Sequence, residues 1–234
     1  MDSIVSGGVR LEFGGGHNVR LSRARGTSSL AAPPVVSKDF VVIPALALPG
    51  RAQQVQSLTQ TVARWGRVGI HAASGYGKTA LLRHVAGLLA SGQPPGSVVY
   101  LRAGGSHLDD LRQRLFRAIY RPPKPVRLTR QDPTALLSRA RSVVVLDDLT
   151  LDPDSLSLLQ DAIPGCVLIA ASDHELTGLR GRSIGLPGLD WEAGLDVVHQ
   201  WLGRPPDWAT AASLHERVDG QPLALRLAAR TDRT

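Results

Sequence analysis

The feature that most constrains this chain is an alternation of short apolar runs with helical segments, between about residues 40 and 187. Continuously apolar strands separated by helices are typical of a parallel sheet covered on both faces. The sequence therefore predicts a doubly wound α/β domain. The predicted strands are RVGIHA (67–72), SVVYLRA (97–103), SVVVLDDL (142–149), CVLIAAS (166–172) and a short fifth, RSIGL (182–186).

The helical segments follow from apolar spacing of three and four residues. They are predicted at 52–65, 78–92, 107–120, 154–163, 190–203, 207–220 and 221–230. Before them, alternating patterns around GGGHN predict a hairpin, and GTSSLAAPPVVS (26–37) predicts a linker. We therefore expect an N-terminal segment over 1–37, which is either poorly ordered or a hairpin, a sheet domain over 38–187 and a helical subdomain over 188–234.

A glycine-bearing loop joins the first strand of this domain to the next helix. Residues 72–79 read AASGYGKT, which matches the phosphate-binding pattern G-x-x-x-x-G-K-[ST] at Gly77, Lys78 and Thr79, with Ala72 at the first glycine position. Glycines allow successive backbone N–H groups to point at an anion, and the following helix adds its positive end. We expect Lys78 to reach the β and γ phosphates and Thr79 to ligate Mg²⁺. The predicted nucleotide contacts here are Ser74, Gly75, Tyr76, Gly77, Lys78, Thr79 and Ala80.

Ala72 tests this interpretation. Alanine adopts a negative φ without cost, so the match is weakened only modestly if that position needs one. A required positive φ would strain the loop.

Two carboxylates end the third strand of the domain, at the sheet edge where open α/β sheets bind ligands. Asp147 is predicted to hold Mg²⁺ together with Thr79, and Asp148 to orient an attacking water, so that Lys78 and Asp148 are the candidate catalytic residues. The alternative is a polar strand end without chemistry. At the end of the fourth strand, Ser172 has two interpretations, contact with phosphate or water and capping of a following helix.

Four motifs in this order resemble the NB-ARC (AP-ATPase) branch of the STAND NTPases over about residues 40–230. They are LPGR, with Gly50 and Arg51, then AASGYGKT, VVVLDDL and GQPLAL (220–225), with Pro222. The resemblance implies a P-loop NTPase three-layer sandwich followed by a small helical subdomain. It further implies that Gly50, Arg51 and Pro222 lie near the nucleotide, ATP or ADP with Mg²⁺, in a regulatory switch that hydrolyses ATP slowly.

The chain also departs from that family. Ala171, Ser172 and Asp173 stand where the family commonly has Thr-Thr-Arg, so an arginine sensor of the γ-phosphate is absent there. Gln221 replaces a leucine of the helical motif. The sequence stops at Thr234, without the winged-helix and repeat modules usual in the family, so we expect either a fragment or divergent minimal member, or functions that reside elsewhere.

Charge and cysteine content bear on partners and location. Lys and Arg number 27 against 20 acids, for a formal charge of +7, and no run of five or six like charges occurs. The excess is therefore expected to be spread over the surface. The single cysteine, Cys166, lies in an apolar run and fits a reducing cytoplasm. The opening residues lack a signal-peptide pattern, and no apolar stretch is long enough to span a bilayer.

Three functions are compatible with these features. The first is the nucleotide-dependent switch, with ATP preferred to GTP and with a second copy or an effector protein as its partner. The second is a P-loop phosphotransferase whose lid is YRPPKPVRLTR (120–130). The third is a nucleic-acid-associated regulator that uses the arginines of the first segment, Arg10, Arg20, Arg23 and Arg25.

Overall fold

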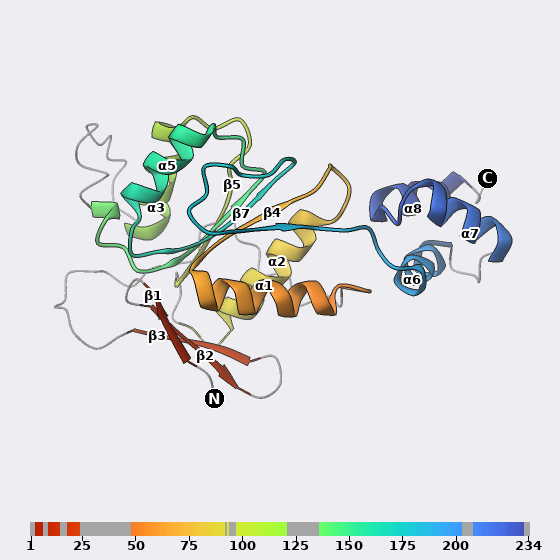
Figure 1. Cartoon of the computed structure of the whole chain (residues 1–234), viewed down its shortest axis with the longest axis horizontal. Coiled ribbons are helices and arrows are strands. Elements are labelled where there is room, and N and C mark those ends of the chain that lie inside the picture. Colours follow the sequence, from red (N-terminus) through yellow and green to blue (C-terminus); the bar gives the residue numbers. More distant parts are fainter. Residues whose placement is uncertain are drawn as a thin grey trace.

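Five parallel strands form the central sheet (Figure 1). The computed structural model describes residues 3–6, 9–14, 18–23, 48–91, 93, 97–120, 136–202 and 208–231. In spatial order the strands are β5 (Val98–Arg102), β6 (Val143–Asp147), β7 (Val167–Ser172), β4 (Arg67–His71) and β8 (Arg182–Gly185). The predicted parallel sheet, with its short fifth strand, is confirmed. Because β7 lies between β4 and β6, the loops that follow these three strands are neighbours at one edge.

Helices cover both faces of the sheet and produce two separate cores. Val143 and Val145 of β6 face one core, whereas Val144 and Leu146 face the other, and all four are fully buried. This division follows from the alternation of side chains along a strand. The first core is covered by α1 (Ala52–Trp65) and α2 (Lys78–Ala90), and the second by α3 (Leu108–Tyr120) and α5 (Pro153–Ala162). The architecture is the predicted three-layer α/β sandwich.

Three further helices follow the sheet and lie beyond one end of it (Figure 1). They are α6 (Trp191–Leu202), α7 (Trp208–Arg217) and α8 (Pro222–Thr231). We call them the helical part. Its small core contains Leu189, Ala193, Val197, Val198 and Leu225. The helices expected after residue 190 are therefore present, while the domain boundaries at residues 37 and 187 stay predictions.

A second, antiparallel sheet precedes α1. It consists of β1 (Ser3–Ser6), β2 (Val9–Gly14) and β3 (Asn18–Arg23), in that order. Both strands of the predicted hairpin are present, and β1 is an additional strand that the four-residue SIVS pattern was too short to reveal. β1 lies beside α1 and β3 lies beside α2 (Figure 1). The predicted linker lies outside the described residues.

Helix boundaries differ from the predictions by a few residues at most. α2 ends at Ala90 with Ser91 at the C-cap, and the glycine expected there, Gly92, lies outside the described residues. α5 begins one residue earlier than predicted, because the Asp152 side chain accepts a hydrogen bond from the Ser155 backbone N–H and Pro153 occupies the first turn.

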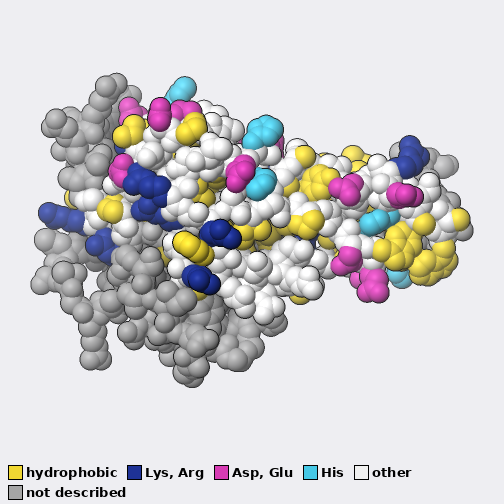
Figure 2. All heavy atoms as spheres, viewed as in Figure 1, with side chains coloured by type: hydrophobic (Ala, Val, Ile, Leu, Met, Phe, Trp, Pro, Cys, Tyr) yellow, Lys and Arg dark blue, Asp and Glu magenta, His cyan; other side chains and the backbone are white. Residues whose placement is uncertain are grey.

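Figure 2, which shows the same side of the molecule as Figure 1, has Lys and Arg side chains gathered around the part that contains the sheet.

Among the helices of the described ranges, none combines the length and the apolar character that a membrane crossing requires.

Candidate functional site

The loop between β4 and α2 has the backbone geometry of an anion-binding loop. Gly75 and Gly77 have φ values of 90° and 92°, in the region that side chains disfavour. The non-glycine residues with positive φ in the described part of the chain are Asp148 and Asp219. Ala72 is therefore not in the left-handed region, and alanine is accommodated at the first glycine position without backbone strain.

The start of α2 leaves its backbone donors available to a ligand. Gly77 is the N-cap, no side chain caps the helix, and its first turn contains no acidic residue. The first N–H groups of a helix have no intrahelical acceptor, and the helix dipole places partial positive charge there. Phosphate oxygens suit both features.

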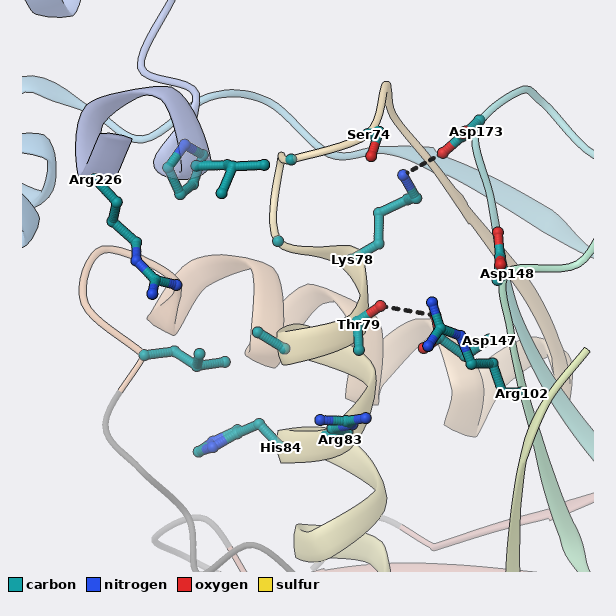
Figure 3. A pocket seen from close by; sticks show the side chains of 16 residues that line it. Ser74, Lys78, Thr79, Arg83, His84, Arg102, Asp147, Asp148, Asp173 and Arg226 are labelled. Atoms are coloured by element: carbon teal, nitrogen blue, oxygen red, sulfur yellow. Dashed lines mark hydrogen bonds and ion pairs between the residues drawn. The ribbon is translucent and has the colours of Figure 1, made fainter. Parts of the chain in front are cut away.

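Lys78, at the first position of α2, is held by three oxygen acceptors. Its Nζ lies 2.7 Å from the Ala72 carbonyl, 3.1 Å from the Ala73 carbonyl and 2.7 Å from Oδ1 of Asp173 (Figure 3). An ammonium group has three N–H donors. A phosphate that engages Lys78 must therefore replace one of these contacts, and Asp173 is the one supplied by a side chain.

Asp147 is fixed by two hydroxyl groups from different elements. Oγ1 of Thr79 donates to Oδ1 of Asp147 at 3.1 Å, and the Tyr100 hydroxyl donates to Oδ2 at 2.7 Å. The Asp147 residue is only 2% exposed. Burial, followed by the contact with Asp147, raises the pKa of Tyr100, so this hydroxyl remains a donor well above neutral pH.

The donor chemistry at Thr79 and Asp147 fits Mg²⁺, which prefers hard oxygen ligands and retains several waters. Thr79 supplies a hydroxyl oxygen that lines the cavity, whereas the buried Asp147 carboxylate fits contact through a water. Among the residues described, no cluster of three or more His, Cys, Asp and Glu side chains offers an alternative metal site.

Asp148 and Ser172 lie at the same edge with different surroundings. Asp148 has a φ of 59°, and its carboxylate lies against Gly104, at a place that a Cβ on Gly104 would occupy. The Ser172 hydroxyl accepts a hydrogen bond from the His174 backbone N–H at 3.4 Å. The residues directly after Ser172 form bends and turns, so the helix-capping interpretation of Ser172 is wrong.

Gly50 and Arg51 contact the phosphate loop and the start of the helical part. Arg51 is 4% exposed and donates to the Tyr76 carbonyl at 2.9 Å and to the Pro187 carbonyl at 2.8 Å. Burial lowers the pKa of Arg51, an effect that Asp190 partly offsets. A Cβ at Gly50 would collide with Ala193 of α6. These two residues thus join the phosphate loop to the segment that leads into the helical part.

The helical part contacts the phosphate loop directly. The Gln221 side chain donates to the Ser74 carbonyl at 2.8 Å, and the Leu223 backbone N–H donates to the Gly75 carbonyl at 3.2 Å. The Tyr76 hydroxyl donates to Asp219 at 3.2 Å. The leucine-to-glutamine departure in the helical motif therefore provides a specific hydrogen bond.

A cavity of about 580 Å³ lies between these elements (Figure 3). This volume is within the range of small-molecule and cofactor sites. The predicted residues that line it are Ser74, Gly75, Gly77, Lys78, Thr79, Ala80, Asp147, Asp148 and Pro222. Gly50, Arg51 and Tyr76 are not among the lining residues, and their role in nucleotide binding stays a prediction.

Sequence reasoning missed several lining residues. They are Leu48, Arg83, His84, Arg102, Leu223 and Arg226, together with Asp173, which the motif comparison noted only as the replacement of an arginine. A signal was available for Arg102 and for Tyr100, the partner of Asp147, because both precede the end of a predicted strand. Alternation places them on the face that carries Val98 and α2.

Known proteins resemble this chain in fold, at low sequence identity. No protein-family model matches the sequence, and no curated protein matches it. The replication initiator DnaA bound to AMPPCP and single-stranded DNA is similar, with a TM-score of 0.51 and 14% identity over 84% of this chain and 65% of DnaA. Domain III of Thermotoga maritima DnaA gives a TM-score of 0.52 and 16% identity, over 82% of this chain and 86% of that one.

A STAND protein with a tetratricopeptide repeat sensor, from Pyrococcus horikoshii, is also similar. It has a TM-score of 0.52 and 18% identity, over 78% of this chain and 29% of that one. The chain spans 65% of the first DnaA structure and 53% of Cdc6p from Pyrobaculum aerophilum. At these identities the likeness establishes architecture, and the chain has the fold of the P-loop NTPases.

Proposed function

We propose that this protein is an ATP- and ADP-binding switch of the STAND type, in which slow hydrolysis changes how the helical part sits on the phosphate loop. The observation that carries the proposal is the direct hydrogen bonding of Gln221 and Leu223 to the carbonyls of Ser74 and Gly75. A phosphate-binding loop that also carries the contacts of a second structural unit couples ligand occupancy to the position of that unit.

In this proposal the phosphates bind at the start of α2, and Lys78 exchanges its contact with Asp173 for a phosphate oxygen. Mg²⁺, held by Thr79 and through water by Asp147, would neutralise charge on the phosphates. Asp148, which lines the cavity, orients the attacking water. Asp173 can return to solvent in this exchange, because its side chain is 51% exposed, whereas the Lys78 side chain, 10% exposed, gains the phosphate as its new partner.

The proposed test measures the distance between the sheet and the helical part. Cysteines introduced as Leu158→Cys on α5 and Ser213→Cys on α7, both exposed, accept a donor and acceptor dye pair. The native Cys166 is buried, and burial raises its pKa to about 11, so it reacts slowly with labels. We expect a transfer efficiency that differs between the ADP and ATP forms. Identical efficiency in the apo, ADP and ATP forms would contradict the switch.

We propose that a second copy of the chain or an effector protein, in the cytoplasm, binds one nucleotide state of the protein in preference to the other. Light scattering in the ADP and ATP forms tests the first alternative. A molecular mass that stays monomeric in both forms would exclude it.

A second candidate function, phosphotransfer to a small acceptor, is favoured by one observation. A cavity of about 370 Å³ adjoins the first, and Asp148 and Asp173 line both. An acceptor bound there would lie beside the phosphate end. The lid predicted for this function, at 120–130, begins with the last residue of α3, and its residues 121–130 lie outside the described residues. A screen of acceptors with labelled ATP that yields only free phosphate would eliminate this alternative.

A further inference from the structure

Arg102 lies at the carboxyl end of the edge strand β5, in register with Asp147 on β6. Alternate residues of a strand share a face, so Arg102 projects on the same side as Tyr100, toward α2. It is exposed and lines the larger cavity together with Thr79 and Asp147. Figure 3 shows its guanidinium directed toward Thr79.

The other positive groups near this position already have partners. The three donors of Lys78 are occupied by two carbonyls and Asp173. The Arg83 guanidinium lies over the ring of Tyr100, 6.0 Å from its centroid. Within the described residues, the guanidinium of Arg102 has no hydrogen bond or ion pair. Arg102 is therefore a cation in the cavity wall that is available to a ligand.

The cavity lining carries negative charge that the Arg102 guanidinium can offset. Three carboxylates line it, on Asp147, Asp148 and Asp173, and a nucleoside triphosphate adds several negative charges at the same end. β7 ends in Ser172 and the chain continues with Asp173, so no arginine stands there to offset them. Arg102 supplies a positive charge to the part of the cavity that Thr79 and Asp147 line, and it does so from the neighbouring strand β5.

We propose that Arg102 binds the terminal phosphate of a nucleoside triphosphate and so makes the site distinguish triphosphate from diphosphate. The inference rests on the proposed function, since it assumes that the cavity binds nucleotide. Thr79 and Asp147 would hold Mg²⁺ at the terminal phosphates, so a side chain next to them would lie at the γ-phosphate end of a bound triphosphate. A guanidinium forms two parallel hydrogen bonds to phosphate oxygens, which an ammonium does not.

The test compares the affinities of ATP and ADP, each with Mg²⁺, by calorimetry on the native protein, Arg102→Ala and Arg102→Lys. Arg117→Ala is the control, because Arg117 is exposed on α3 and lies away from the cavity. We expect Arg102→Ala to lower the affinity for ATP about 10- to 100-fold, as loss of charge-assisted hydrogen bonds does. The affinity for ADP should change less than about 2-fold. Arg102→Lys should be intermediate, and Arg117→Ala unchanged.

Two failures are distinguishable. If the native protein binds nucleotide and Arg102→Ala keeps the native ratio of ATP to ADP affinity, the role of Arg102 is overturned and the proposed function stands. If the native protein binds neither nucleotide, the proposed function is overturned and this inference with it. Thermal unfolding of each variant checks that the exposed substitution leaves the fold intact.

Discussion

Two aspartates lie at the carboxyl ends of neighbouring strands of the sheet, and their surroundings differ sharply. Asp147, at the end of β6, is 2% exposed and accepts hydrogen bonds from the uncharged hydroxyls of Thr79 and Tyr100. Asp173, directly after β7, is exposed and contacts the charged Lys78. Two hydroxyl donors hold the buried carboxylate in position, whereas a carboxylate as exposed as that of Asp173 exchanges its partner more readily. One aspartate is therefore fixed in place, as the proposed metal role requires, and the other has the exposed carboxylate that the proposed ligand would displace.

The largest effect in this comparison is expected from Asp147→Asn, which keeps the side-chain shape and removes the charge. We expect the Mg²⁺-dependent part of ATP affinity to fall about 10- to 100-fold, because a metal-orienting carboxylate is lost. ATP titrations with and without Mg²⁺ measure it. Asp154→Asn, exposed in the first turn of α5, is the control. An unchanged Mg²⁺ dependence would show that Asp147 does not serve the metal.

A smaller effect in the same direction is expected from Tyr100→Phe, which removes only the hydroxyl that donates to Asp147. We expect the Mg²⁺ dependence to weaken about 3- to 10-fold and the free energy of unfolding to fall by about 1 kcal/mol. The control is Tyr120→Phe, since the Tyr120 hydroxyl donates to the Leu136 carbonyl, far from the cavity. Equal Mg²⁺ dependence in the two variants would contradict the role of Tyr100.

The pH dependence of this contact has a definite sign. The pKa of Tyr100 is raised, so the folded state retains the hydroxyl proton at pH values where the unfolded chain loses it. Its contribution to stability is therefore complete below about pH 10, the usual tyrosine pKa, and is lost only as the pH rises through the higher folded value. We expect the native Mg²⁺ dependence to be constant from pH 7 to pH 10, and Tyr100→Phe to share that constancy.

Asp173→Asn should act in the opposite direction and less strongly. Removing the charge that competes for Lys78 is expected to tighten ADP binding by up to about 5-fold, the range of an exposed ion pair. Asp161→Asn is the control, because the Asp161 side chain is 59% exposed, close to the 51% of Asp173, and forms an ion pair with Arg180 at 2.6 Å, outside the lining of the cavity. Weaker ADP binding in Asp173→Asn would mean that Asp173 assists the ligand and does not compete with it.

The smallest effect on affinity is expected from Gln221→Ala, which removes the hydrogen bond to the Ser74 carbonyl. Nucleotide affinity should change less than about 2-fold, while hydrogen exchange in α8 should rise about 2- to 10-fold, as loss of one hydrogen bond allows. Gln56→Ala, exposed on α1, is the control. Unchanged exchange in α8 would indicate that Gln221 does not hold the helical part to the loop.

What the sequence could predict depends on the range of the interaction. α1 has its predicted bounds, 52–65, the glycines of the predicted loop have positive φ, and Asp147 ends β6, because helix periodicity and loop patterns act over a few residues. Tyr100 and Asp173 were missed as partners of Asp147 and Lys78, since those contacts span 47 and 95 residues. The Tyr100–Asp147 contact depends on the pairing of β5 with β6, and the Lys78–Asp173 contact depends on the pairing of β7 with β4. No local pattern encodes which strands pair.

The measurement that tests the central claim most directly is nucleotide binding by calorimetry with Mg²⁺, using ATP, ADP and GTP on the native protein and on Lys78→Ala. We expect adenine-selective binding by the native protein and at least about 10-fold weaker binding by the variant, because a charge-assisted contact to phosphate is lost. Binding of equal strength in both proteins, or none in the native protein, would contradict the assignment of this cavity to a nucleotide.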